Sequence, residues 1–404
     1  MLNGGPSTNY QWRLKDQCII AGVASVGYWR KCDRTEVSLA AEAVLKASLD
    51  AGIDVKDIDG VVTYQYNNDS IRPQELAQAL GLPGMRFWIE NWLGGTVGAV
   101  LLSTAVMAIN AGMANNVVVY RSAKHKSGRV RIGGTGASAD TGGLEQFLVP
   151  QGWANFYTSH APPAVRHMHD YGTTEEHLGA IALNAYSNAQ LNDRAVAKGW
   201  GPKTMEEYLK SPYLAYPFRR WDFTSEVDGA CAYLVTSAEK AGGLKQKPVY
   251  ITSLAQAATP DPMHYGRSAH YDLIGDNLVR GAASYYADDL FGAAGITRDD
   301  VDIFCPYDHS SIGVIWQLED LGFCAKGEGG PFAASGAISR TGKLPVNPGG
   351  GLMAEGYLHG TNLVIDAVEN LRGTAGARQI PDARVALFVS GAGPVGGAGL
   401  LTVQ

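Results

Sequence analysis

The chain has 404 residues, 46% of them hydrophobic and 18% charged, so it is long enough to bury two cores or one large layered core. The formal net charge of -6 argues against a nucleic-acid-binding protein, whose surface would be basic, and any anionic ligand must meet a local positive patch. The N-terminal residues MLNGGPSTNYQWRLKDQ hold no apolar stretch preceded by basic residues, and no later stretch is long enough for a membrane span. We therefore expect a cytoplasmic enzyme that binds neither nucleic acid nor a membrane.

The positions of the cysteines and glycines indicate further which kinds of site to expect. The cysteines are scattered without a CxxC pair, which predicts neither a disulfide framework nor a zinc site. We expect reduced, mostly buried thiols at Cys18, Cys32, Cys231, Cys305 and Cys324. The glycines gather in short clusters at 94–98, 327–330, 349–351 and 391–399. Such clusters indicate tight backbone turns around a site.

The first clear element is a helical pattern at 37–52, VSLAAEAVLKASLDAG, followed by IDVKDID and the β-rich run GVVTY at 60–64. The same order returns in the second half of the chain. There GAASYYADDLFGAAG at 281–295 precedes ITRDDVD and the run IFCPY at 303–307. The offset between the two copies is constant, which indicates a repeated helix–strand unit.

A second unit is duplicated in the same way. Residues 95–122 contain a glycine turn, an apolar helical pattern and the run NNVVVYRS, and residues 359–391 contain a matching turn, helix and the run RVALFVSG. Short continuous β-branched runs are typical of buried parallel strands. Two such units in each half predict duplicated α/β domains packed against each other. Chance similarity between common α/β units is the other interpretation.

The segment 123–275 lacks this rhythm and is rich in aromatic residues, Pro and Gly. We interpret it as a long insertion that covers the site. Within it, 173–189 predicts a helix, because Thr173 or Thr174 can cap its N-terminus and two glutamates follow. The predicted organisation is 1–122 for the first part of the N-terminal half, 123–275 for the insertion and the end of that half, and 276–404 for the C-terminal half.

Three stretches carry a family resemblance: HDYGTTEEHLGAIALNAYSNAQLN, SPYLAYPFRRWDFTSEVDGACAYLVTS and PVNPGGGLMAEGYLHGTN. They resemble thiolases of the sterol-carrier-protein-x type in order and spacing, and the resemblance extends over about residues 18–403. It implies an α/β thiolase fold, a duplicated five-layered αβαβα architecture, here with a long covering insertion, and a dimer. The implied architecture agrees with the internal repeat.

The departures from the thiolase pattern bear on function. Thiolases carry a nucleophilic cysteine at the start of the helix that begins here in WLGGTVGA, and no cysteine lies within 88–105. Tyr307 replaces the His of the family's His-Asp-Ala-Phe-like motif, and Tyr357 replaces the His of its Gly-His-Pro motif. The late cysteine before the last glycine loop is also missing, and Ser390 stands there. An acyl-enzyme route is therefore not expected.

Paired tyrosines in these two motifs are similar to the lipid-transfer-protein-like aldolases of bacterial steroid side-chain degradation. That resemblance implies a carbon–carbon lyase that cleaves a β-hydroxyacyl-CoA, here a steroid side-chain thioester, to a ketone or aldehyde and a short acyl-CoA such as propionyl-CoA or acetyl-CoA. No bound cofactor is implied, because coenzyme A is part of the substrate. A small OB-fold/zinc-ribbon partner protein and a homodimer core, together an α2β2 assembly, are implied as well.

Tyrosine side chains suit a retro-aldol reaction, in which a β-hydroxyl loses a proton and the α-carbon of a thioester enolate gains one. The ordinary phenol pKa of about 10 must be lowered, or the proton relayed, for a phenolate to act near neutral pH. Asp308 would raise the pKa of Tyr307, so a cationic or hydrogen-bonding neighbour is needed. His309 and His359, each two residues from a tyrosine, are the candidates. His309 would share a face with Tyr307 if the strand extends that far.

The enolate oxygen needs fixed hydrogen-bond donors. Backbone N–H groups of Gly94 and Gly95 at a helix start, or of Gly391 and Gly393 in the last glycine loop, can supply them. Tyr265, in DPMHYGRSAH, lies in a segment expected to cover the site and is a third tyrosine candidate. The sequence does not decide which tyrosine is the acid and which the base.

Two other functions stay open at this point. A catalytically silent acyl-CoA or sterol-binding protein would also lack the nucleophile, and a thiolase-type acyltransferase with an unusual nucleophile is the third interpretation. No metal site is expected, although His167, His169, Asp170 and His177 lie close in sequence, because such a pattern before a helix is common and the resembled family uses no metal. Ser390 lacks the Gly-x-Ser-x-Gly elbow of a serine nucleophile.

Overall fold

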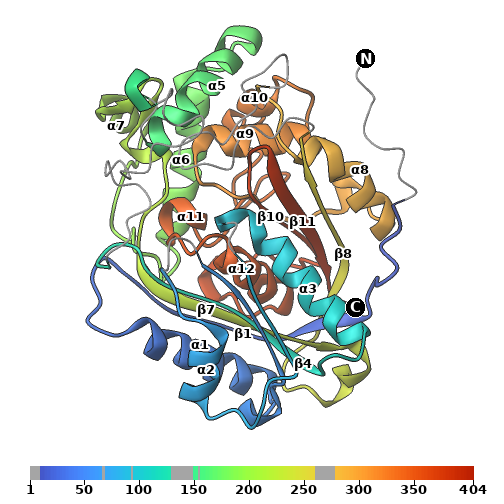
Figure 1. Cartoon of the computed structure of the whole chain (residues 1–404). Helices are drawn as coiled ribbons and strands as arrows, with labels where there is room; N and C mark the ends of the chain where they lie inside the picture. Colours follow the sequence, from blue (N-terminus) through green and yellow to red (C-terminus); the bar gives the residue numbers. More distant parts are fainter. Residues whose placement is uncertain (1–9, 66–68, 92–93, 129–148, 153–154, 260–277) are drawn as a thin grey trace.

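A computed structural model describes the chain apart from residues 1–9, 66–68, 92–93, 129–148, 153–154 and 260–277 (Figure 1). The helices of the described residues are α1 (Glu36–Ala51), α2 (Pro73–Leu80), α3 (Gly98–Asn110), α5 (Phe156–Tyr171), α6 (Glu175–Ala189), α7 (Met205–Lys210), α8 (Ala283–Ala294), α9 (Ser311–Asp320), α10 (Gly329–Ala334), α11 (Gly351–Ala354) and α12 (Thr361–Arg372). The strands are β1 (Cys18–Trp29), β2 (Gly60–Tyr64), β3 (Phe87–Asn91), β4 (Asn116–Lys124), β5 (Tyr213–Ala215), β6 (Phe218–Arg219), β7 (Asp228–Ser237), β8 (Val249–Ala258), β9 (Ile303–Cys305), β10 (Val385–Ser390) and β11 (Val395–Thr402).

The main sheet has an internal repeat. Its strand order is β3-β2-β4-β7-β1-β8-β11-β10-β9. From the middle outward, β1-β7-β4-β2 and β8-β11-β10-β9 have the same pairing senses, which are antiparallel, antiparallel and parallel. The two half-sheets meet where β1 pairs with β8, through Ile19 with Tyr250 and Ile20 with Val249. The duplication predicted from the helix–strand units is therefore present in the topology.

The two copies of the first unit also end their helices in the same way. Gly52 after α1 and Gly295 after α8 adopt left-handed conformations, with φ of 74° and 67°. The next residue in each copy, Ile53 or Ile296, donates its backbone N–H to a carbonyl in the last turn of the helix. Glycine suits these positions because it has no Cβ to clash at positive φ.

Helices and half-sheets alternate in five layers, as expected. Helices α1 and α8 cover the outer faces of the two half-sheets, and α3 and α12 each contact strands of both halves and so lie between them (Figure 1). Strand β4 is continuously apolar because both of its faces are buried. Val118 and Tyr120 face the core beneath α1, whereas Val117 and Val119 face the central core with α3.

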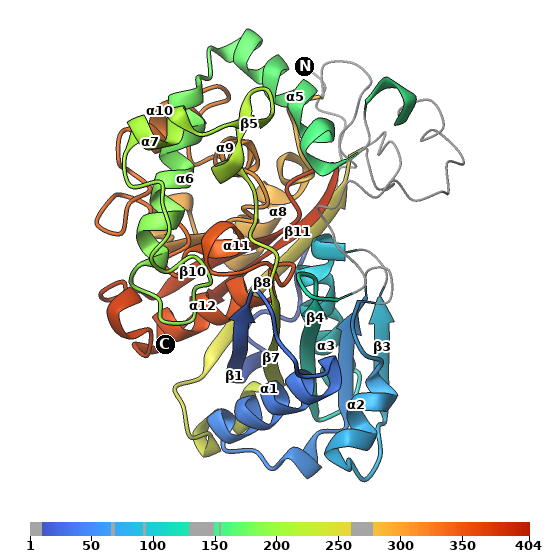
Figure 2. The same ribbon diagram turned by 90° about the vertical axis from the view of Figure 1, so that its left-hand side faces the viewer.

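Residues 123–275 match the predicted insertion in part. Helices α5, α6 and α7 lie together on the C-terminal half (Figure 2), and the helix expected at 173–189 is α6, capped by the side chain of Thr174. The same segment also holds β7 and β8, which are central strands of the sheet, so the covering part is shorter than expected. The domain boundaries at 122 and 275 stay a prediction. Over the described residues, the structure offers no helix with the length and apolar character needed to cross a bilayer.

Candidate active site

Two tyrosines meet inside the C-terminal half. Tyr307 follows β9 and Tyr357 follows α11, and their hydroxyl oxygens lie 2.8 Å apart in a hydrogen bond. Both side chains are buried. Because each phenol hydroxyl can donate and accept, the pair can pass a proton from one oxygen to the other.

The position of Tyr307 is fixed from two sides. The amide of Gln317 in α9 accepts the backbone N–H of Tyr307 at 2.8 Å and donates to its carbonyl oxygen at 3.0 Å. On the other side, Gly95 lies against the phenol, because a Cβ built there would lie 1.6 Å from the Tyr307 hydroxyl oxygen. A glycine at this point of the turn before α3 is therefore what lets the hydroxyl reach Tyr357.

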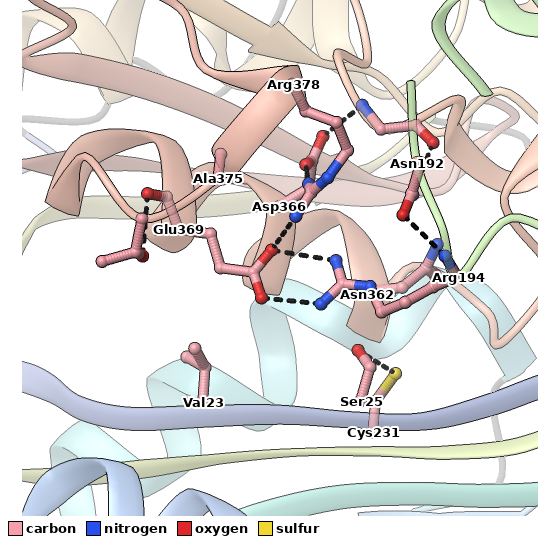
Figure 3. A network of polar contacts seen from close by, with 12 residues as sticks. Val23, Ser25, Asn192, Arg194, Cys231, Asn362, Asp366, Glu369, Ala375 and Arg378 are labelled. Atoms are coloured by element: carbon pink, nitrogen blue, oxygen red, sulfur yellow. Dashed lines mark hydrogen bonds and ion pairs between the residues drawn. The ribbon is translucent and has the colours of Figure 1, made fainter. Parts of the chain in front are cut away.

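The segment that carries Tyr357 is anchored by a buried polar network. The side chains of Asn192 and Asn362 each donate to the carboxylate of Glu355 at 2.9 Å, two residues before Tyr357. Beside them, Figure 3 shows Glu369 of α12 between the guanidinium groups of Arg194 and Arg378. These charges are paired and hydrogen-bonded, as buried charges must be to remain ionised.

His309 lies beside Tyr307, but not through a shared strand face, because β9 ends at Cys305 and does not reach either residue. The ring centroids of His309 and Tyr307 are 5.4 Å apart, and Nδ1 of His309 lies 3.2 Å from the Tyr307 carbonyl oxygen. Nε2 of His309 contacts Nε2 of His160, a fully buried residue of α5, at 2.6 Å. A helix of the covering segment thus reaches the site.

His359 lies beside the other tyrosine, its ring centroid 4.6 Å from that of Tyr357. Its Nδ1 is 3.4 Å from Nη2 of Arg121, which also lies 3.0 Å from Nε2 of His125 and closer still to the carboxylate of Asp69. Burial opposes ionisation of Asp69, but Arg121 and His125 hold the pKa of its carboxyl below the ordinary range. Burial and the nearby Arg121 charge hold the pKa of His359 well below its ordinary value. Both effects favour the neutral imidazole of His359.

This cluster has the donor geometry of a metal site without fitting a cation well. One ligand atom each from Asp69, His125 and His359 lies within 4.8 Å of the others. Nη2 of Arg121 contacts all three residues, so a guanidinium nitrogen already supplies the positive charge among them. The cluster is better described as a buried, charge-balanced support for His359.

Asp308, expected to disturb Tyr307, is turned to another partner. Its carboxylate accepts the backbone N–H groups of Leu352 at 2.8 Å and Met353 at 3.3 Å. Burial raises the pKa of this carboxyl to about 7, against the opposing effect of these hydrogen bonds. Asp308 therefore ties the Tyr307 segment to the segment of Tyr357.

The predicted enolate-binding turns come together at the start of α3. Gly391 follows β10 at a φ of 79°, and a Cβ there would lie 2.6 Å from the side chain of Thr96, beside Gly94 and Gly95. The hydroxyl of Ser390 accepts the backbone N–H of Ala99. The carbonyl of Gly393, in contrast, accepts from Ala282 at the start of α8. The role of these glycines in binding an enolate stays a prediction, and Tyr265 lies outside the described residues.

The histidines that were considered as a metal cluster contact different partners. His167 is buried, with its nitrogens on Thr173 and Glu319, whereas His169 is exposed and pairs with Asp170. The ring of His177 packs near Gly330.

Sequence reasoning missed His160, Arg121, Asp69, His125 and Gln317. One signal was available: Arg121 is a charged residue at the end of the apolar run NNVVVYRS, and a charge within a buried strand demands a buried partner. The other residues stand in no recognisable motif.

Comparisons with known proteins identify the family of this chain. The family described as thiolase C-terminal domain-like matches residues 268–401. A protein of Mycobacterium tuberculosis named 17-hydroxy-3-oxo-4-pregnene-20-carboxyl-CoA lyase is 35% identical, over 90% of this chain and 93% of its own. A steroid side-chain-cleaving aldolase of Thermomonospora curvata is 33% identical, over 94% and 96% of the two chains. Among solved structures, the Ltp2-ChsH2(DUF35) aldolase superposes with a TM-score of 0.88 at 31% identity, covering 96% of this chain and 98% of that one.

Proposed function

The chain belongs to the thiolase-like family of steroid side-chain-cleaving aldolases, and from this premise we propose that its two buried tyrosines carry out the proton transfers of a retro-aldol cleavage. It is a carbon–carbon lyase that acts on a steroid acyl-CoA. The finer substrate is a β-hydroxyacyl-CoA whose side chain is split into a steroid ketone or aldehyde and a short acyl-CoA, such as propionyl-CoA or acetyl-CoA.

The observation that carries the assignment of roles is the 2.8 Å hydrogen bond between the hydroxyls of Tyr307 and Tyr357. Retro-aldol cleavage removes one proton from the β-hydroxyl and adds one to the α-carbon. If one tyrosine takes the first proton and the other gives the second, the direct hydrogen bond returns the proton between them. The site then completes a turnover without gaining or losing a proton.

A covalent route is disfavoured by the state of the thiols. Cys305, two residues before Tyr307, is fully buried, and burial raises the pKa of its thiol well above the ordinary value. Burial likewise raises the pKa of Cys231 to about 12. A thiolate is the nucleophilic form, so neither residue is prepared for acyl transfer. The cysteines are free thiols, which agrees with a reducing, cytoplasmic setting.

We also propose a partner and an assembly. The similar solved structure is an aldolase together with a DUF35 protein, so this chain is expected to bind a small OB-fold/zinc-ribbon protein of that kind. Two copies of the chain would form the core, with two copies of the partner in an α2β2 complex. No resident cofactor is proposed, because the coenzyme A moiety arrives with the substrate.

The direct test is product release. The purified chain, with and without its DUF35 partner, is mixed with a steroid β-hydroxyacyl-CoA, and the products are separated by chromatography. Equal amounts of a steroid ketone or aldehyde and a shorter acyl-CoA are expected. Substrate that stays bound but intact with the partner present would favour a binding protein, and an acylated chain detected by mass spectrometry would favour an acyltransferase.

A further inference from the structure

A pair of buried imidazoles lies next to the tyrosine pair, and its proton count can be read from its contacts. His160 and His309 meet through their Nε2 atoms at 2.6 Å. Nδ1 of His160 lies 2.8 Å from the carbonyl oxygen of Phe156, and Nδ1 of His309 lies 3.2 Å from the carbonyl oxygen of Tyr307. A carbonyl oxygen only accepts, so each Nδ1 carries a hydrogen.

With both Nδ1 atoms protonated, two neutral rings would point lone pairs at each other across 2.6 Å. A single proton between the two Nε2 atoms removes this repulsion and gives the pair one positive charge. Ser159 fits the same count, because its hydroxyl donates to the Phe156 carbonyl at 2.9 Å and can accept from Nδ1 of His160 at 3.2 Å. The other neutral arrangement has a hydrogen between the two Nε2 atoms but only one hydrogen on the two Nδ1 atoms. It would leave one Nδ1 lone pair facing a carbonyl oxygen.

The surroundings of the pair direct its charge toward one tyrosine. Phe156 and Phe223 pack their rings against the histidines, and among the described residues Tyr307 is the tyrosine whose ring packs against His309. The carboxylate of Asp308 is turned to the backbone of α11, and Asp222 is held by Tyr208 and Ser311.

The neighbourhood of Tyr357 has a different charge. Nδ1 of His359 faces Nη2 of Arg121, which can only donate, so Nδ1 is the acceptor and the ring hydrogen is on Nε2. The charge of Arg121 is matched by Asp69. A neutral histidine therefore lies beside Tyr357, whereas the ring beside Tyr307 is that of His309, a member of the imidazole pair.

We propose that His160 and His309 share one proton, and that the resulting positive charge makes Tyr307 the phenolate base while Tyr357 keeps its hydroxyl and acts as the acid. This assignment rests on the proposed function. His160 acts through His309 and is a positioning residue. The charge of the phenolate balances that of the imidazole pair, and the hydroxyl of Tyr357 donates to the phenolate across 2.8 Å.

The cleavage then balances. The Tyr307 phenolate takes the β-hydroxyl proton, the β-carbon becomes the ketone or aldehyde carbonyl, and the pair of electrons of the broken carbon–carbon bond enters the thioester enolate. The α-carbon of the enolate takes the hydroxyl proton of Tyr357. The proton on Tyr307 passes to the Tyr357 phenolate through their hydrogen bond, which restores the starting state.

The first test is the pH profile of kcat/KM for His160→Gln and His309→Gln, measured on the chain with its partner. An amide cannot carry the charge, so the acid limb should move upward by about 1–3 pH units, the usual effect of a charge at this range, and turnover should recover at high pH. The double variant should show no further shift. His169→Gln, an exposed histidine on the same helix, is the control and should keep the wild-type profile. The proposal would be overturned if the acid limb of the kcat/KM profile did not shift, or if kcat/KM fell by the same factor at every pH.

The second test needs no turnover. Ultraviolet absorbance of the phenolate is titrated in the wild-type chain, in Tyr307→Phe and in Tyr357→Phe. The lowest-pH ionisation should disappear in Tyr307→Phe, remain in Tyr357→Phe and move upward in His160→Gln. Its loss in Tyr357→Phe alone would reverse the assignment. If the wild-type chain released no ketone or aldehyde, the proposed function would fail while this titration still reported on the histidine pair.

Discussion

Replacing Gly95 by Ala should disable the tyrosine pair without touching either tyrosine. A Cβ at this position would lie 1.6 Å from the Tyr307 hydroxyl oxygen and 2.4 Å from Cζ. The two groups must separate by about 1.4 Å to reach 3.0 Å, the shortest distance that real Cβ atoms tolerate. Because a misplacement of 1 Å at a reacting group can cost about 10²-fold in rate, we expect kcat to fall by at least that factor. The overpacked site should also lose about 1–3 kcal/mol of unfolding free energy.

Turnover and thermal unfolding of Gly95→Ala are compared with those of Gly84→Ala, whose added Cβ meets nothing within 4 Å. The control should match the wild type in both measurements. In a Tyr307→Phe background the hydroxyl is already absent, so Gly95→Ala should reduce kcat little further. If Gly95→Ala alone kept nearly wild-type turnover and an unchanged melting temperature, the close packing of Gly95 on Tyr307 and its role in the reaction would both be refuted.

Three further predictions concern the thiols, a buried carboxyl and the assembly. Alkylation of accessible cysteines should leave turnover largely intact, and if Cys305→Ala is still inactivated with loss of one remaining thiol, a covalent route returns. Because the pKa of Asp308 is raised to about 7, its stabilising contribution is complete below the unfolded pKa of about 4 and is lost as pH rises toward 7. Asp308→Asn should therefore weaken the fall in melting temperature between these pH values, and an unchanged slope would argue against a buried neutral carboxyl. Light scattering should show a dimer of the chain, and a stable monomer would contradict the proposed core.

Most of the fold could be predicted from the sequence because its internal repeat produces local sequence patterns. The left-handed glycines Gly52 and Gly295 end equivalent helices, and the apolar runs that follow them form equivalent strands. The strands β7 and β8 were missed as framework elements. They pair antiparallel with their neighbours and do not follow the helix–strand rhythm, so they merged with the covering segment in the sequence.

The site was accessible only where motifs mark it. Tyr307 and Tyr357 were predicted as site residues because they replace histidines in two recognisable motifs, and His309 and His359 were predicted because they are close to these tyrosines in sequence. His160 and Arg121 come from α5 and β4, and only the packing of distant segments brings them to the tyrosines. His309 was expected to lie beside Tyr307 on one face of a strand. In the structure the two residues follow β9 in a loop, and Nδ1 of His309 contacts the Tyr307 carbonyl oxygen.

The central claim is that the two phenol hydroxyls transfer protons, and removing each hydroxyl in turn tests it most directly. Tyr307→Phe and Tyr357→Phe keep the packing volume, so folding and KM should change little, whereas kcat should fall by about 10² or more in each variant. The double variant should be far less than multiplicatively worse, because both residues act on one proton cycle. If both single variants kept kcat within about threefold of wild type, the tyrosines would be packing residues and the proposed mechanism would be wrong.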